Sequence, residues 1–439
     1  MTPRTRSSRN NSLHRPARDW ASLARLAARS ALALALVAVA LSLGPTFPAE
    51  ARSKARAFAA TLTPADRQAF EAYYAALKFH EAAVDAYWAR VARIKKVRRA
   101  RLRKRQLVTE QHYVTDKPPK YSGPPISKAL SRAWRRFRNS DPARPSRPRP
   151  SLPNLADYLA YAKTHYNFAP ERIPEAEFKR RYAKEALRLG LTKEQVVRVY
   201  ALETGGLGTA DMVAGIHPIR RTGRPISSAM GYAQLLAANT LLVLQKHGAS
   251  FEKRLIGLRD TAVEPQRRAI LVDKIRKLRA MRAYVNRIPR KWRVLQRKSR
   301  TGPGRGVHAI NIDGDIGPWV QVIKLRDVKR FAERKGRSTL SSEQLELMNL
   351  AGPGTGIEMM SSIGSRMPTS NFFSRRGYYR NSIVRGRVAS ELLQALGDRM
   401  NANERNSGAR EFAAIFDRLL QRRQARREAR SELRLESIR

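Results

Sequence analysis

The sequence predicts a mostly helical protein. Apolar residues recur at helical spacing in several long segments, and the region after Leu155 has no strand-like alternation. Helix start signals precede two of these segments, at Thr63-Pro64 and at Thr192 with Gln195 three residues on. With 439 residues and 42% hydrophobic content, the chain is long enough for one substantial core or two.

The composition is strongly basic and lacks cysteine. The formal net charge of +51 predicts attraction to polyanions that salt screens. DNA, RNA, an anionic membrane and a bacterial cell wall all qualify, so charge alone does not choose among them. The absence of cysteine excludes disulfides, thiolate metal sites and cysteine nucleophiles.

The first 51 residues have the pattern of a secretory signal peptide. Seven arginines between positions 4 and 29 precede the apolar run from Ala31 to Gly44, and Ala49-Glu50-Ala51 fits the small-x-small cleavage rule. The run is shorter than the roughly 20 residues of a spanning helix, and a retained signal anchor is the alternative. We therefore expect export to the bacterial cell envelope, with membrane contact only through this segment. Export argues against a nucleic-acid role.

Residues 52–112 are expected to form a long amphipathic or coiled helix, and 113–154 a linker. Apolar residues repeat every seven from Phe70 and again from Tyr73, which suits either a coiled coil or a helix docked on the body. His80 on this seam is expected to be a packed residue. The prolines and arginines of the linker predict an extended or disordered stretch, within which SKALSRAWRRFR can form a short basic helix.

The helix expected from Thr192 ends in a carboxylate, Glu203, because Gly205 and Gly206 follow at once. The negative end of the helix dipole disfavours a charged carboxylate, and partial burial raises its pKa. A general acid needs these conditions near neutral pH. The alternative is a solvated surface glutamate before an ordinary glycine cap.

The second half of this stretch resembles the lysozyme-like lytic transglycosylases of the soluble-transglycosylase type. That family has a helix ending in Glu-Ser, a Gly/Ala-rich loop, and a Gly-Leu-Met-Gln turn that opens the next helix. Here Glu203-Thr204 is followed by a loop and by Gly231-Tyr232-Ala233-Gln234. The family's Tyr-Asn-Ala-Gly motif has an imperfect counterpart in Asn349-Leu350-Ala351-Gly352, where Asn349 stands in the tyrosine position.

The resemblance implies a lysozyme-like helical domain over residues 155–400, with an insertion at about 250–320. It implies that Glu203 is a single catalytic acid and base that cleaves the bond between N-acetylmuramic acid and N-acetylglucosamine and leaves a 1,6-anhydro end. The residues expected to hold sugar or orient this carboxylate are Thr204, Gly231, Tyr232, Gln234 and Asn349. No metal or cofactor is implied, and the expected partners are peptidoglycan strands and anionic envelope polymers.

The remaining sequence adds a charged insertion and a basic end. Residues 250–300 predict a helical hairpin or arm, TGPGRG at 301–306 a loop, and 401–439 a basic C-terminal helix. Asp313 and Asp315 are the nearest candidates for a second catalytic carboxylate, although aspartates beside glycine usually form turns.

Two other functions fit the sequence. One is a catalytically inactive, peptidoglycan-binding scaffold with the same fold, which the degraded third motif and the long insertion favour. The other is a basic nucleic-acid-binding protein whose apparent signal peptide is accidental. The charge suits it, but the sequence contains no recognised nucleic-acid-binding module, so we expect no specific nucleic acid.

Overall fold

The computed structural model describes residues 49–140 and 152–436, which form α-helices and short 3-10 turns. Within these ranges there are 16 α-helices and no strand, only isolated β-bridges. The mostly helical fold class is therefore confirmed, whereas its lysozyme-like character stays a prediction. No helix in the described ranges combines the length and apolar character needed to cross a bilayer. The expected signal peptide lies outside the described residues except at Ala49–Ala51, where helix α2 (Ala49–Ala60) begins.

The described residues fall into two compact units, one of residues 49–87 and 119–140 and one of 88–118 and 152–436. Helix α3 (Pro64–Arg103) contributes to both. It begins as the sequence predicts, because the Thr63 hydroxyl accepts a hydrogen bond from Asp66 N at 3.3 Å and Pro64 occupies the first helical position.

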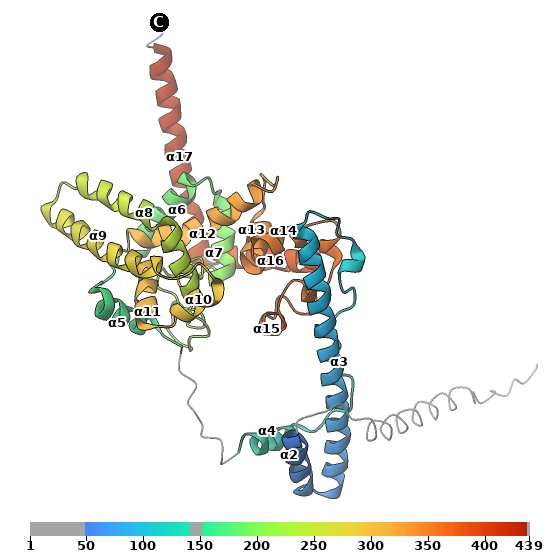
Figure 1. The fold of residues 1–439 in the computed structure, drawn as a ribbon. Coiled ribbons are helices and arrows are strands. Elements are labelled where there is room, and N and C mark those ends of the chain that lie inside the picture. Colours follow the sequence, from blue (N-terminus) through green and yellow to red (C-terminus); the bar gives the residue numbers. More distant parts are fainter. Residues whose placement is uncertain (1–48, 141–151, 437–439) are drawn as a thin grey trace, which may run out of the picture. The chain divides into compact units, whose positions relative to one another are not determined.

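The first unit is an aromatic cluster formed by α2, the first part of α3 and α4 (Lys128–Asn139), which lie together in Figure 1. Phe58 of α2 packs against Phe70 of α3 with ring centroids 4.9 Å apart. Trp134 of α4 lies 5.1 Å from the first ring and 5.2 Å from the second. The short basic helix expected within the linker is present as α4, and it buries its apolar side in this cluster.

The heptad seam of α3 packs against segments of the same chain. Phe70, Val84, Tyr87 and Val91 are buried, and His80 packs edge-on against Tyr121 with ring centroids 5.6 Å apart. These contacts favour the docked-helix alternative over pairing with another chain, and they make His80 the packed residue that the sequence predicts.

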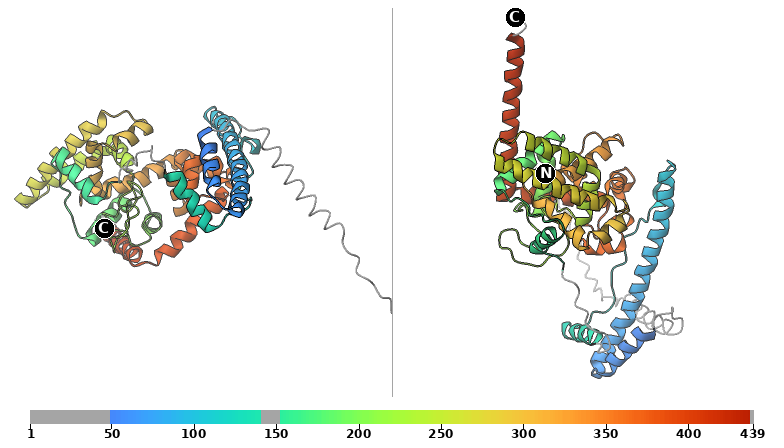
Figure 2. Two further views of the ribbon diagram at one scale, coloured as in Figure 1. Left: turned by 90° about the horizontal axis from the view of Figure 1, so that it is seen from below. Right: turned by 60° about the vertical axis from the view of Figure 1, so that its left-hand side comes forward.

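The second unit contains the other helices (Figures 1 and 2). Their bounds are α5 (Leu155–Tyr166), α6 (Glu175–Arg188), α7 (Lys193–Thr204), α8 (Ala237–Asp260), α9 (Pro265–Asn286), α10 (Trp292–Lys298), α11 (Gly302–His308), α12 (Ile316–Glu333), α13 (Ser342–Ala351), α14 (Pro353–Met359), α15 (Arg375–Arg380), α16 (Ala389–Glu404) and α17 (Ser407–Glu436). The 3-10 turns are η1 (Glu110–His112), η2 (Ala309–Ile312), η3 (Gly364–Arg366) and η4 (Thr369–Asn371).

Helix α12 joins the two apolar clusters of this unit. Val322, Leu325 and Val328 belong to the cluster formed with α6, α7, α13 and α17. Trp319 and Val320 belong to the cluster formed with α8, α9 and α11. A helix that is apolar on several faces is one that other elements surround, so α12 is the central element of the unit.

The region predicted as an insertion is partly as expected. Helices α8 and α9 form an antiparallel hairpin, which confirms that part of the prediction (Figure 1). The loop predicted at 301–306 is wrong, since this segment starts α11: Thr301 accepts a hydrogen bond from Gly304 N and proline stands in the first turn. The glycines are required by close packing, because a Cβ on Gly304 would lie 2.0 Å from Lys298 O. The C-terminal helix begins at Ser407 and extends beyond its neighbours (Figures 1 and 2).

Candidate active site around Glu203

Helix α7 holds Glu203 in a fixed position at its last turn. Thr192 and Gln195 form the predicted capping box, and Gly205 ends the helix in the left-handed conformation with φ 66°. The freed carbonyl oxygens at this end accept hydrogen bonds from α16 and the segment after it. Asn403 Nδ2 donates to Ala201 O at 2.9 Å, and Asn406 Nδ2 donates to Gly205 O at 2.8 Å.

Gly206 permits the close approach that these hydrogen bonds require. Its φ is +69°, and a Cβ there would lie 2.2 Å from Asn403 O. Any other residue would separate the end of α7 from α16. The Gly-Gly pair therefore does more than end the helix, because it fixes the backbone that carries Glu203.

A second carboxyl group, that of Glu346 on α13, makes a hydrogen bond with Glu203. Glu203 is half-buried, whereas Glu346 is only 2% exposed. Asn349, one turn further along α13, joins them: its Nδ2 lies 3.1 Å from Glu346 Oε2 and 3.5 Å from Glu203 Oε1. The predicted partner Asn349 is thus brought to Glu203.

Lys324 of α12 supplies the positive charge that acts most strongly on Glu203. Burial raises the pKa of Glu203, and the charge of Lys324 opposes this rise more than any other group does. Burial lowers the pKa of Lys324, while the two carboxylates raise it again. No ion pair joins Lys324 to either carboxylate in the described ranges, so its charge acts on them without direct contact.

The two carboxyl groups share their protons unequally. Burial and the neighbouring Glu203 hold the pKa of Glu346 well above its usual range, so Glu346 keeps its proton when Glu203 ionises. A protonated Glu346 then donates its hydrogen bond to the Glu203 carboxylate. The raised pKa of both carboxyl groups favours a protonated form, which is the condition that a general acid requires.

The direct contact limits what the second carboxyl group can do. Retaining glycosidases place their two carboxyl groups about 5–5.5 Å apart and inverting enzymes about 6.5–9.5 Å apart, so that sugar or water fits between them. Hydrogen-bonded carboxyl groups leave no such space. This arrangement does not suit Glu346 as a nucleophile or base on the other side of a sugar from Glu203.

Two of the predicted sugar-binding residues are buried in the core. The Thr204 hydroxyl donates to Tyr200 O at 2.6 Å, and the Tyr232 hydroxyl donates to Glu175. Tyr232 is 1% exposed, and its ring centroid lies 5.0–5.6 Å from those of Phe178, Tyr182, Tyr200 and Phe412. The sugar-binding roles predicted for these two hydroxyls are therefore corrected to structural ones.

The turn at Gly231 and Gln234 has a structural role as well. Gly231 has a φ of +74°, and Gln321 of α12 packs where its Cβ would be. Gln321 Oε1 accepts a hydrogen bond from Tyr232 N at 2.7 Å. Gln234 Nε2 donates to Gly231 O at 2.8 Å, within its own turn. The motif thus anchors a core aromatic residue against α6 and α7, and neither side chain contacts Glu203.

Asp313 and Asp315 belong to a different cluster. Asp315 receives ion pairs from Lys274, Arg267 and Arg181, the last two at 2.7 Å. Lys274 also pairs with Asp313 at 3.0 Å. These buried aspartates attach α9 and α6 to the start of α12, so their predicted candidacy as a second catalytic carboxylate is corrected.

One signal in the sequence could have identified Glu346 as a neighbour of Glu203. Glu346 stands three positions before Asn349, so both residues lie on one face of a helix. If Asn349 lies beside Glu203, Glu346 is therefore expected to lie there too. No pattern in the sequence pointed to Lys324, because α12 meets this site only through tertiary packing.

Comparison of the chain with family models, with curated proteins and with solved structures found no match in any of the three. The family resemblance thus rests on the motifs around Glu203 and Asn349 and on the chemistry of the site.

Proposed function

We propose that the protein is an exported lytic transglycosylase that cleaves peptidoglycan with Glu203 as its single acid and base. Glu203 first protonates the glycosidic oxygen between N-acetylmuramic acid and N-acetylglucosamine. It then removes the proton of the muramyl 6-hydroxyl, whose oxygen bonds to the anomeric carbon and closes the 1,6-anhydro ring. The proton balance closes on one carboxyl group, with no water consumed.

The observation that carries this proposal is the direct hydrogen bond between Glu203 and Glu346. A two-carboxylate hydrolase needs its second carboxylate on the other side of the sugar. The contact between Glu203 and Glu346 therefore supports a mechanism in which Glu203 alone exchanges protons with the substrate. Asn349 fits a role in orienting both groups, since its Nδ2 reaches each of them. Lys324 lowers the pKa of Glu203, which keeps the carboxyl able to return as a base.

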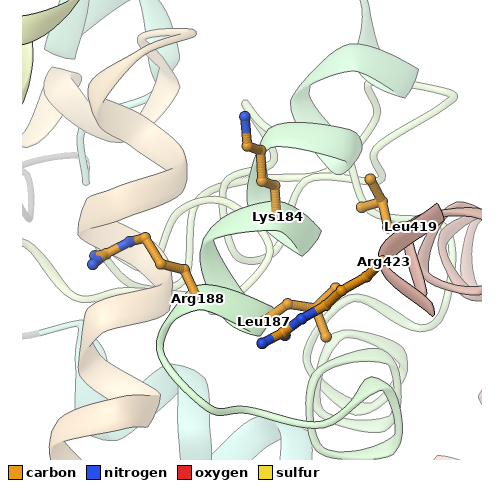
Figure 3. A pocket seen from close by; sticks show the side chains of 5 residues that line it. All are labelled: Lys184, Leu187, Arg188, Leu419 and Arg423. Atoms are coloured by element: carbon orange, nitrogen blue, oxygen red, sulfur yellow. The ribbon is translucent and has the colours of Figure 1, made fainter. Parts of the chain in front are cut away.

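The basic surface supports attachment to an anionic polymer of the envelope. Figure 3 shows a hollow of about 380 Å³ lined by Lys184, Leu187 and Arg188 of α6 and by Leu419 and Arg423 of α17. Arg188 is paired with Glu185 at 2.7 Å, so Lys184 and Arg423 are the cations that this hollow offers to an anionic polymer. Such a site adds affinity that does not depend on glycan sequence and that weakens with salt.

The proposal is tested by digesting purified sacculi with the protein and with Glu203→Gln, and by reading the released products by mass. We expect anhydro-muropeptides from the first and a loss of about 10²–10⁴-fold in rate for the second, the usual contribution of a positioned acid and base. Glu194→Gln, an exposed carboxylate at the start of the same helix, is the matched control and should retain full activity.

Other products would change the conclusion. Products with reducing ends would mean hydrolysis and would contradict the single-carboxyl mechanism. Binding to sacculi without release of any product, by both forms, would favour the scaffold function. The observation that favours the scaffold is that the hollow between α6 and α17 does not include Glu203 in its lining.

A further inference from the structure

A larger hollow lies in the second unit, between the end of α3 and the start of α14. Its volume is about 810 Å³, within the range of sites that hold small molecules. Leu102, Leu107, Phe331, Ile357 and Ile363 supply most of its apolar lining. None of the residues around Glu203 contributes to it, so it is separate from the candidate active site.

Leucines at the rim of this hollow are exposed to solvent. The Leu107 side chain is 74% exposed and Leu102 is 44% exposed. Single exposed leucines are common, but two that adjoin an apolar hollow form a continuous apolar patch. Such a patch marks a binding surface.

The backbone holds Leu107 in place. Two residues after the end of α3, Arg105 adopts the left-handed conformation at φ 56°, and Gln106 N donates to Arg101 O at 3.0 Å. The Arg101 guanidinium then donates to Leu107 O at 2.8 Å. A left-handed arginine costs free energy that a glycine would not. The chain accepts this strain in a turn that presents a leucine to solvent.

Cationic side chains border the same patch. Arg99, Leu102 and Arg103 share one face of α3, because they are three and four residues apart. Neither arginine forms an ion pair in the ranges that the structure describes. The nearest carboxylate in the lining, Glu358, is already held by the buried Arg98.

We propose that this hollow, with Leu107 and the pair Arg99 and Arg103 at its rim, docks the protein on an anionic phospholipid membrane. An acyl chain would enter the apolar interior while the phosphate meets the two guanidinium groups. The combination of exposed apolar side chains and unpaired cations is the chemistry of interfacial membrane binding. This contact is additional to the one expected of the apolar segment at 31–44, and it does not depend on Glu203.

The absence of cysteine from the chain gives a direct test. Ser362, an exposed residue of the hollow's lining, is changed to cysteine and labelled with a polarity-sensitive dye. The full-length protein is then mixed with phosphatidylglycerol or phosphatidylcholine vesicles. We expect a blue shift with the anionic vesicles only. A label at Ser431→Cys on the arginine-rich α17 should report no apolar environment.

Variants of the rim identify the groups responsible. Arg99→Gln with Arg103→Gln should weaken the binding reported by the Ser362 label about thirty-fold, from about 1 kcal/mol for each basic residue near an anionic surface. The double change Arg426→Gln with Arg427→Gln on α17 removes the same charge elsewhere and should have a much smaller effect. Leu107→Ser should reduce the blue shift itself without unfolding the protein, since this side chain is exposed.

Three results would overturn the proposal. The first is a silent Ser362 label on vesicles that carry bound protein, which would place the contact at another segment. The second is an equal shift with phosphatidylcholine, which would remove the role of the arginines. The third is that the α17 control variant weakens vesicle binding as much as the rim variant does. The binding would then depend on net charge alone.

Discussion

Two clusters of buried acids in the second unit show opposite electrostatics. Burial alone raises the pKa of Asp315, but Lys274 and Arg267 contact it directly and bring its pKa below the ordinary value. Burial also raises the pKa of Glu346, and there the neighbouring Glu203 raises it further. The surroundings therefore favour the charged form in the first cluster and the protonated form in the second.

The difference lies in direct contacts with cations. Asp315 has three cationic partners in direct contact, while Glu203 and Glu346 have Lys324 near them without an ion pair. A buried carboxylate that is fully paired holds elements together, and one that is incompletely paired exchanges protons. Carboxyl groups therefore serve structure where cations pair with them, and where cations do not, they have the raised pKa that suits an acid.

The largest expected effect comes from breaking the paired cluster. Lys274→Met leaves Asp313 and Asp315 buried with fewer partners, so we expect a loss of about 3–5 kcal/mol in the free energy of unfolding at pH 7. Urea unfolding followed by circular dichroism measures it. Arg276→Met on the same helix is the control, because its pair with Asp273 is on the surface and should contribute less than about 1 kcal/mol. Equal losses of stability in the two variants would contradict the view that the buried pairs of Lys274 hold the fold together.

Substitution in the incompletely paired cluster of Glu203 and Glu346 should increase the free energy of unfolding instead of lowering it. Since the pKa of Glu346 is raised by folding, the folded chain binds more protons than the unfolded chain above pH 4.5, and stability falls as pH rises toward the folded pKa. Glu346→Gln removes this dependence and should add about 1–3 kcal/mol to stability at pH 8 relative to wild type, with little gain at pH 4. Urea unfolding at both pH values measures the gain, and a gain confined to low pH would contradict the assignment.

The pH dependence of activity should change when Lys324 is replaced. Lys324 is the strongest influence that opposes the raised pKa of Glu203, so Lys324→Met should raise that pKa further. If Glu203 acts first as an acid, the fall of kcat/KM on the alkaline side moves to higher pH. The pH profile of sacculus digestion measures this shift, with the exposed Lys335→Met as a control. An unchanged or acid-shifted profile would exclude Lys324 from the site.

The smallest effect is expected from Arg399 of α16. Its positive charge also lowers the pKa of Glu203, but this side chain is exposed and its influence is the weakest of those named. Arg399→Gln should move the alkaline limb in the same direction as Lys324→Met and by less. High salt should abolish the difference from wild type, because solvent ions screen an exposed charge. A shift that persists in high salt would mean a direct contact.

Local sequence signals predicted the helices well where a cap accompanied the apolar spacing. Thr192 with Gln195 and the glycine at 205 bounded α7 correctly, and the Pro64 start of α3 was also found. The same reasoning failed at 301–306. There proline and glycine suggested a loop, while packing against α5 formed the helix α11.

The sequence by itself determined the helical fold class, the end of α7 and the placement of one carboxylate there. These depend on neighbours within a few residues, whose spacing is written in the chain. Only the tertiary structure decided that Tyr232 is a core residue, that Asp315 is paired, and that Glu346 and Lys324 join Glu203. Burial and charge at a site depend on which distant helices meet, and here α12 brings the residues of both acidic clusters into place.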